Sequence, residues 1–287
     1  MNLAIQVLGY GGIVPITIAV AAMYLCGRWL PPAASDRYAA AVACGIAFFV
    51  GYALLPSWAE LWPTRHWQWL PYLAGAAMII GPAALAKGVF VPERVLLLLM
   101  LALIAAWLLV PKWSRIEAQY VQNVVGMTAG FVLLSTLLDP LPKRMPPAFF
   151  VGILAVVTVC LSLALASSLS LKYGQVASIA AASLAGCSVG HVFLKNEIAA
   201  RGLVPVFTLV VGGCAFVGFI GHDPPETLML LLPLAPLALW ATMWGPVSRL
   251  RGLAALTVKA AFVILPLTVA MSFLMLAERA GGDIYGS

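Results

Sequence analysis

Residues 148–170 read AFFVGILAVVTVCLSLALASSLS, a stretch without a charged side chain that is long enough to cross a lipid bilayer as a helix. Backbone groups find no water in lipid, and the apolar residues do not alternate as in a barrel strand, so a helix is predicted. Nine further stretches are similarly long and apolar, although 91–110 contains Glu93 and Arg94 and 253–276 contains Lys259. The ten stretches are 3–26, 38–55, 69–86, 91–110, 120–138, 148–170, 176–194, 203–221, 227–245 and 253–276. We therefore expect an all-α, polytopic transmembrane helix bundle of about ten spans, folded as a single membrane-embedded domain over residues 1–287.

The composition excludes a water-soluble fold. Of 287 residues, 63% are hydrophobic and only 9% are charged, and the mean hydropathy is +1.03. Soluble domains carry about 25% charged residues. The net charge of +6 does not indicate nucleic-acid binding, because the basic residues stand singly or in pairs between apolar stretches. The expected partner is the lipid bilayer, and the oligomeric state stays open.

The basic residues alternate between connectors. The odd-numbered connectors carry two each, namely Arg28 with Arg37, Lys87 with Arg94, Lys143 with Arg144, Lys195 with Arg201, and Arg249 with Arg251. The other connectors and the tail share Arg65, Lys112, Arg115, Lys172 and Arg279. Because positive loops stay in the cytoplasm, both termini are predicted outside, in a bacterial-type inner membrane. Four tryptophans of the outer connector, Trp58, Trp62, Trp67 and Trp69, are predicted to anchor it at the interface, with a cage around a substrate as the alternative.

A weak internal repeat relates the two halves of the chain. Pro92, Glu93 and Trp107 recur at one constant spacing as Pro225, Glu226 and Trp240. The half-repeats would be residues 3–138 and 148–276, five helices each. An odd number of helices turns the second unit upside down, so this would be an inverted repeat. Glu93 has an alternative role, since an acid in the first turn of a helix is stabilised by the helix dipole.

Inverted repeats favour transport, because two antiparallel copies can open a midplane cavity to each side in turn. In size and plan, ten helices in two groups of five resemble the drug and metabolite transporter superfamily. No residue role is carried over from that resemblance.

Two ionisable residues are candidates for lining such a cavity. Lys259 is the one charged residue well inside a predicted span, where ionisable groups are expensive and often functional. Alternatively its ammonium group reaches back to the membrane interface. His191 lies near the cytoplasmic end of its helix and lines the same vestibule or serves in packing.

Three neutral polar residues on stretch 120–138 complete the candidate set: Gln122, Asn123 and Thr128. Amides in lipid need partners, so they bond to a neighbouring helix or face a polar cavity. No metal site, cofactor motif or pair of intramembrane carboxylates accompanies them, so no metal or cofactor is expected.

Residues 186–190, GCSVG, match the Gly-x-Ser-x-Gly pattern of serine hydrolases, with His191 directly after. That pattern needs a strained strand-to-helix turn, whereas a continuous helix is predicted here. Gly186 with Gly190, like Gly126 with Gly130, suits close helix packing instead. We therefore expect no enzyme. The favoured function is a transporter or facilitator of a small solute or lipid-like molecule, the alternative is a structural or assembly membrane protein, and an intramembrane serine hydrolase is the remote one.

Overall fold

The structure is a computed structural model that describes residues 9–55, 62–85, 90–194, 200–222, 227–244 and 252–282. Within these residues the chain forms ten α-helices and no strand, so the all-α prediction is confirmed there. The helices are α2 (Val14–Trp29), α3 (Pro32–Ala53), α4 (Leu70–Ala83), α5 (Val91–Leu109), α6 (Tyr120–Leu138), α7 (Pro147–Ser168), α8 (Leu171–Leu194), α9 (Leu203–Gly221), α10 (Leu228–Leu231) and α11 (Gly252–Gly282). Tighter or wider turns extend four of them: η1 (Gly9–Ile13), η2 (His66–Trp69), η3 (Ser114–Gln119) and η5 (Leu232–Met243).

Prolines mark several helix starts. α3, α4, α5 and α7 each have a proline in their first two positions, where the missing N–H costs no hydrogen bond. In α5 the carboxylate of Glu93 also accepts a hydrogen bond from the backbone N–H of Phe90 at 3.1 Å. The helix-start role of Glu93 is thus confirmed. Glu226, the proposed repeat partner of Glu93, and Pro225, the proposed partner of Pro92, lie outside the described residues.

Within the described residues, seven helices are long and apolar enough to cross a membrane, which supports an integral membrane protein. They comprise Gly11–Trp29, Val91–Leu109, Glu117–Lys143, Pro147–Ser168, Leu171–Phe193, Leu203–Gly221 and Gly252–Leu276. The other three have shorter apolar parts. α4 has 14 residues, or about 21 Å, against a hydrocarbon core of about 30 Å. The apolar parts of α3 and of α10 with η5 are likewise short, and Pro233 and Pro236 tighten η5 into a 3₁₀ helix. Ten helices are therefore found, while ten spans remain a prediction.

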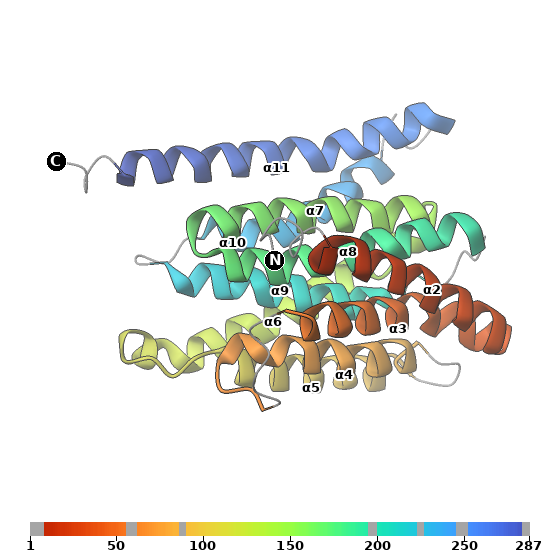
Figure 1. The fold of residues 1–287 in the computed structure, drawn as a ribbon, viewed down its shortest axis with the longest axis horizontal. Coiled ribbons are helices and arrows are strands. Elements are labelled where there is room, and N and C mark those ends of the chain that lie inside the picture. The colour runs from red at the N-terminus through yellow and green to blue at the C-terminus, as the bar shows by residue number, and fades with distance from the viewer. Residues whose placement is uncertain are drawn as a thin grey trace.

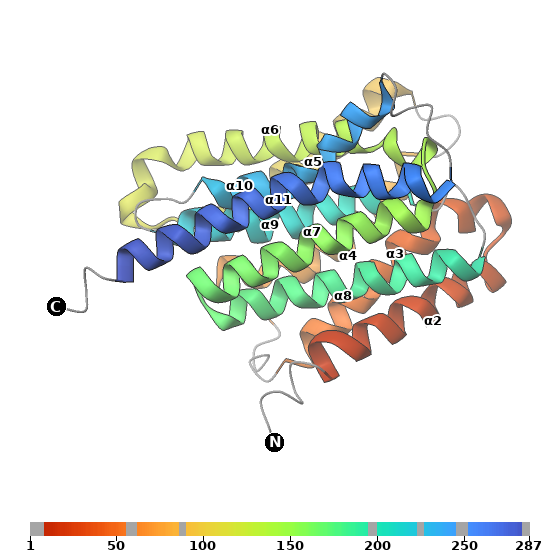
Figure 2. The ribbon, with the colours of Figure 1, turned by 90° about the horizontal axis from the view of Figure 1, so that it is seen from above.

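Helix α9 forms the centre of the bundle. It packs against α3, α4, α5, α6, α7, α8, α10 and η5, and its side chains are buried along almost its whole length. α11 lies along one edge, beside α7, and packs only on α7, α10 and η5 among the described elements in substantial contact (Figures 1 and 2). The buried side chains around α9 form one core to which every helix contributes.

The bundle has two ends that differ in chemistry. The arginine end, defined by Arg94, Asp139 and Arg201, holds the start of α5, the end of α6 and the start of α9. The tryptophan end, defined by η2 and the connector from α5 to α6, lies opposite. Leu108, at the far end of α5 from Arg94, lines a pocket with His66 and Trp67 there. The 14-residue separation of Arg94 and Leu108 corresponds to about 21 Å of helix.

The packing does not clearly show an inverted repeat. In an inverted repeat, equivalent helices of the two halves should pack in the same way. Two contacts agree with this, because α2 packs on α3 as α7 packs on α8, and α5 packs on α6 as η5 packs on α11. However, α2 also packs closely on α8, whereas the equivalent pair, α7 with α3, makes no comparable contact in the described residues. The half-repeats therefore stay a hypothesis, as do the cell compartment and the outside location of both termini.

Candidate functional site

The structure brings two of the five predicted site residues together. Gln122 and Asn123 line one cavity near the start of α6. Thr128 is buried one to two turns further along α6 and donates to the carbonyl oxygen of Val124 at 2.7 Å. His191 is buried near the end of α8, and Lys259 is half-buried on the peripheral α11. None of these three is among the residues that line the cavity with Gln122 and Asn123.

The cavity that holds the two amides, called here the amide cavity, has a volume of about 390 Å³. It lies between α6, α9, α10 and η5, and its remaining lining is apolar or glycine: Gly126, Met127, Gly130, Phe131, Leu134, Gly212, Phe216, Phe219, Leu230, Pro233 and Leu234. Neither amide has a side-chain hydrogen bond to a described residue. The cavity is therefore amphipathic, with two amides at one end and hydrocarbon and rings along the rest.

Gly126 and Gly130 keep the amide cavity open. A Cβ atom built on either glycine would meet nothing within 4 Å. The prediction that this pair packs against a neighbouring helix is wrong, because the facing space is the cavity and not a helix. The corresponding prediction for Gly186 and Gly190 is confirmed. A Cβ on Gly186 would lie 2.6 Å from the carbonyl oxygen of Ile16, and one on Gly190 would lie 2.6 Å from the sulfur of Met23, both on α2.

Ser188 takes part in the same helix packing. Its hydroxyl donates to the carbonyl oxygen of Ala148 on α7 at 2.8 Å, within the continuous helix α8. The hydroxyl proton thus joins two helices, and the surrounding backbone is not the exposed turn that a hydrolase nucleophile needs.

A second, larger hollow runs along α7 and α8 beside the start of α2, with a volume of about 740 Å³. Small residues such as Ala155, Ser162, Gly174 and Ala182 line it, and it contains no charged side chain. Its hydroxyls are engaged locally. The hydroxyl of Ser162 donates to the backbone carbonyl oxygen of Gly174 at 2.7 Å, and that of Ser178 to the backbone carbonyl oxygen of Gln175 at 2.8 Å. The wall is therefore mainly apolar.

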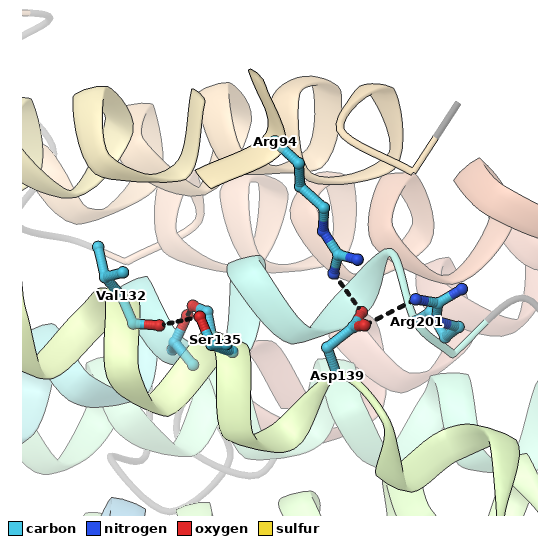
Figure 3. A network of polar contacts seen from close by, with 7 residues as sticks. Arg94, Val132, Ser135, Asp139 and Arg201 are labelled. Atoms are coloured by element: carbon cyan, nitrogen blue, oxygen red, sulfur yellow. Dashed lines mark hydrogen bonds and ion pairs between the residues drawn. The ribbon is translucent and has the colours of Figure 1, made fainter. Parts of the chain in front are cut away.

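A charged network stands at the arginine end (Figure 3). The carboxylate of Asp139 lies 2.7 Å from Nη2 of Arg94 and 2.6 Å from Nη2 of Arg201. Only 12% of the Asp139 side chain is exposed, compared with 27% for Arg94 and 17% for Arg201. The two guanidinium groups both contact the one carboxylate of Asp139. The network therefore joins α5, α6 and α9, and we interpret it as structural.

At the tryptophan end a polar hollow of about 550 Å³, called here the aromatic pocket, lies between η2, the α5–α6 connector and the start of α8. Its lining is Thr64, Arg65, His66, Trp67, Trp69, Leu108, Val110, Pro111, Lys112, Trp113 and Tyr173. The interfacial-anchor prediction is wrong for Trp67, which is 6% exposed and packs edge-on against Tyr52 and Tyr173. The exposure of Trp62, 74%, agrees with an interfacial anchor. Trp58 lies outside the described residues.

Sequence reasoning missed the aromatic pocket because its residues come from three connectors far apart in the chain. The one local indication was His66 between Arg65 and Trp67, since a histidine in so apolar a chain is rare. Among the described residues, no group of three or more His, Cys, Asp or Glu side chains could hold a metal ion. No protein-family model, curated protein or solved structure matches this chain.

Proposed function

We propose that this membrane protein binds an uncharged, lipid-like molecule in the amide cavity and carries it within the bilayer. The observation that carries the proposal is the pairing of two amides, without partners among the described residues, with a hollow that two glycines leave open on the same helix face. Of the two ligand classes expected from the sequence, a small solute or a lipid-like molecule, this geometry favours the second.

The size and lining of the amide cavity support the proposal. Ligand pockets usually measure about 300–1,000 Å³ and combine apolar walls with a few polar groups that orient the ligand. The cavity falls in this range at about 390 Å³. The described residues of its lining include no charged side chain that could compensate an ion for its lost hydration. An uncharged head group can instead exchange hydrogen bonds with Gln122 and Asn123 while its chain lies against Phe131, Phe216 and Phe219.

The position of the amides suits a ligand that arrives from the membrane. Gln122 and Asn123 stand in the first turn of α6, close to the level where head groups meet the hydrocarbon core. Gln122 is exposed and Asn123 is half-buried, so a ligand can reach them from the lipid side. In this carrier the two amides bind the ligand and catalyse no reaction.

Filling the cavity tests the binding step. The probe is a fluorescent, NBD-labelled diacylglycerol titrated into the purified protein in a neutral detergent. Gly126→Leu and Gly130→Leu should each weaken binding at least about tenfold, a loss of about 1.4 kcal/mol, because the new side chains occupy the hollow. Ala129→Leu is the matched control, since Ala129 is exposed on the same helix and does not line the cavity. Absence of binding to the unmodified protein, or an equal loss in Ala129→Leu, would refute the proposed ligand site.

The carrier step has its own measurement. Diacylglycerol crosses a bilayer too quickly by itself, so an uncharged NBD-labelled glycosyl-diacylglycerol, whose sugar head group slows spontaneous exchange, is placed in both leaflets of proteoliposomes. Exchange between leaflets is followed by quenching the outer one with dithionite. Protein-dependent exchange that Gly126→Leu slows and Ala129→Leu leaves unchanged supports carriage. Binding without exchange would leave a lipid-binding structural or assembly protein in its place.

A further inference from the structure

The aromatic pocket combines features that together specify an anion. Arg65 and Lys112 line it, and the described residues of its lining include no aspartate or glutamate. Neither cation forms an ion pair with a carboxylate within the described part of the chain. Two basic side chains in one hollow, without a carboxylate partner among the described residues, favour a negatively charged ligand.

The loop that carries Arg65 is held in place by Gln68. Its side-chain oxygen accepts hydrogen bonds from the backbone N–H groups of Thr64, at 2.8 Å, and Arg65, at 2.9 Å. The Thr64 hydroxyl lies 3.2 Å from the same oxygen. The backbone that presents Arg65 is therefore fixed before any ligand arrives, which reduces the entropy that binding must remove.

Two aromatic rings hold the side chain of Lys112 in place. Its ammonium nitrogen lies 5.4 Å from the ring centre of Trp107 and 5.7 Å from that of Tyr120. Such cation–π contacts hold the charge near one place without neutralising it. Lys112 thus keeps its three N–H donors for a ligand.

His66 adds a polar atom that lacks a partner. Its ring packs edge-on against Trp113, with ring centres 5.2 Å apart, and its Nε2 atom is buried without a hydrogen-bond partner among the described residues. Burial, and then the charge of Arg65, lowers the pKa of His66 to about 4, so the ring is neutral near neutral pH. A neutral imidazole can place its one N–H on Nε2 and donate to an anionic oxygen.

We propose that the aromatic pocket binds a phosphate group through Arg65, His66 and Lys112. A phosphate offers several oxygens in a tetrahedral arrangement, so it can accept from a guanidinium fork, an ammonium group and an imidazole at once. The rings of Trp67, Trp113 and Tyr173 form walls around this donor set. The phosphate belongs to a lipid head group or to a soluble phosphate ester, and the chemistry is the same for both. This inference is independent of the amide cavity.

The two sources are separated by choosing the probe. To keep the amide cavity out of the measurement, the Gly126→Leu protein, in which that cavity is filled, is purified in a phosphate-free maltoside detergent. It is titrated with glycerol 3-phosphate, with phosphatidic acid in mixed micelles, and with diacylglycerol as the lipid that lacks phosphate. Binding is followed by tryptophan fluorescence, since Trp67 and Trp113 line the pocket, and by native mass spectrometry. Phosphatidic acid binding alone indicates a head-group site, and binding of both phosphate compounds indicates a site for phosphate esters in general.

Matched variants decide whether the pocket is responsible. Arg65→Gln and Lys112→Gln should each weaken phosphate binding at least about tenfold, and Arg65→Lys should weaken it less, because the charge remains while the fork is lost. Arg65 and Lys112 are exposed, so these changes leave the buried core intact. Lys172→Gln is the control, because Lys172 is exposed at the same end without lining the pocket. Failure of both phosphate probes to bind, or an equal loss in Lys172→Gln, would overturn the proposal.

Discussion

Asp139 and Arg201 join the end of α6 to the start of α9 across 62 positions of sequence, with Nη2 of Arg201 donating to Oδ2 of Asp139 at 2.6 Å. Arg94 reaches the other oxygen of the same carboxylate from the start of α5 (Figure 3). A single carboxylate thus pairs with two guanidinium groups at one end of the bundle. Since α9 is the central helix, this contact also fixes where α9 begins relative to α5 and α6.

We predict that Asp139→Asn destabilises the protein by about 2 kcal/mol. Breaking a fully buried pair typically costs about 3–5 kcal/mol. The smaller value applies because Arg94 and Arg201 keep 27% and 17% of their side-chain surface exposed, so water partly compensates for the lost charge. Thermal unfolding in detergent measures the change. Glu117→Gln, at an exposed acid, is the control and should unfold like the unmodified protein. Equal behaviour of the two variants would show that the network does not stabilise the fold.

Hydropathy predicted the long central helices well because their environment is uniform. Stretch 148–170 appears as α7 (Pro147–Ser168) and stretch 203–221 as α9 (Leu203–Gly221). In lipid, a helix is the simplest way to satisfy the backbone of such a segment, so composition suffices. Composition predicts the length of α4 less well. Its apolar stretch, 69–86, forms a helix of only 14 residues that contains Pro82.

The candidate sites depended on tertiary packing that hydropathy does not contain. Gly126 with Gly130 and Gly186 with Gly190 have identical spacing, yet one pair faces a cavity and the other contacts α2. The difference lies in the neighbouring helix. The aromatic pocket is a similar case, because Arg65, Lys112 and Tyr173 meet only after three connectors have folded onto one end of the bundle.

The two glycine pairs predict opposite effects of one substitution. Gly186→Ala should destabilise the protein by about 1–3 kcal/mol, because its Cβ would lie 2.6 Å from the carbonyl oxygen of Ile16 and 2.9 Å from its Cα, and backbone atoms cannot easily yield. Gly126→Ala should be neutral or stabilise by up to about 1 kcal/mol, since alanine favours the helix and its Cβ meets open space. Thermal unfolding of both variants checks this. A stable Gly186→Ala protein would contradict the close packing of α2 on α8.

His66 predicts an acid-dependent loss of stability. Burial lowers its pKa to about 4 in the folded protein, whereas an unfolded histidine has a pKa of about 6.5. The unfolded chain therefore takes up the proton first, and this contribution to the free energy of unfolding falls as the pH drops from about 6.5 to about 4. Above that range the residue has no effect. Unfolding temperatures measured between pH 7.5 and 4 should fall less steeply in His66→Gln, and an unchanged slope would argue against the buried position of the ring.

Phosphate binding should strengthen as the pH falls, for a related reason. An anion beside His66 favours its protonated form, so the pKa of His66 rises on binding and a proton is taken up. The other charged side chains that line the pocket are Arg65 and Lys112, and its one phenol is that of Tyr173. A phosphodiester probe such as phosphatidylglycerol is used because its own charge is constant there. Its affinity should increase from pH 7 to pH 5 in the unmodified protein and stay nearly constant in His66→Gln. A rise of equal size in both would assign the effect to another group.

The two ends of the bundle predict labelling from opposite sides of the membrane. Lys112 contacts Tyr120 at the start of α6, and Arg144 follows the end of α6, so 19 residues of helix, or about 28 Å, separate their surroundings. The excess of basic residues in the connectors at the arginine end predicts that this end faces the cytoplasm. In a background without the five natural cysteines, a membrane-impermeant maleimide added to intact cells should label Lys112→Cys and should label Arg144→Cys only after lysis. The reverse pattern would invert the orientation and keep α6 as a span, whereas labelling of both from one side would show that α6 does not cross the membrane.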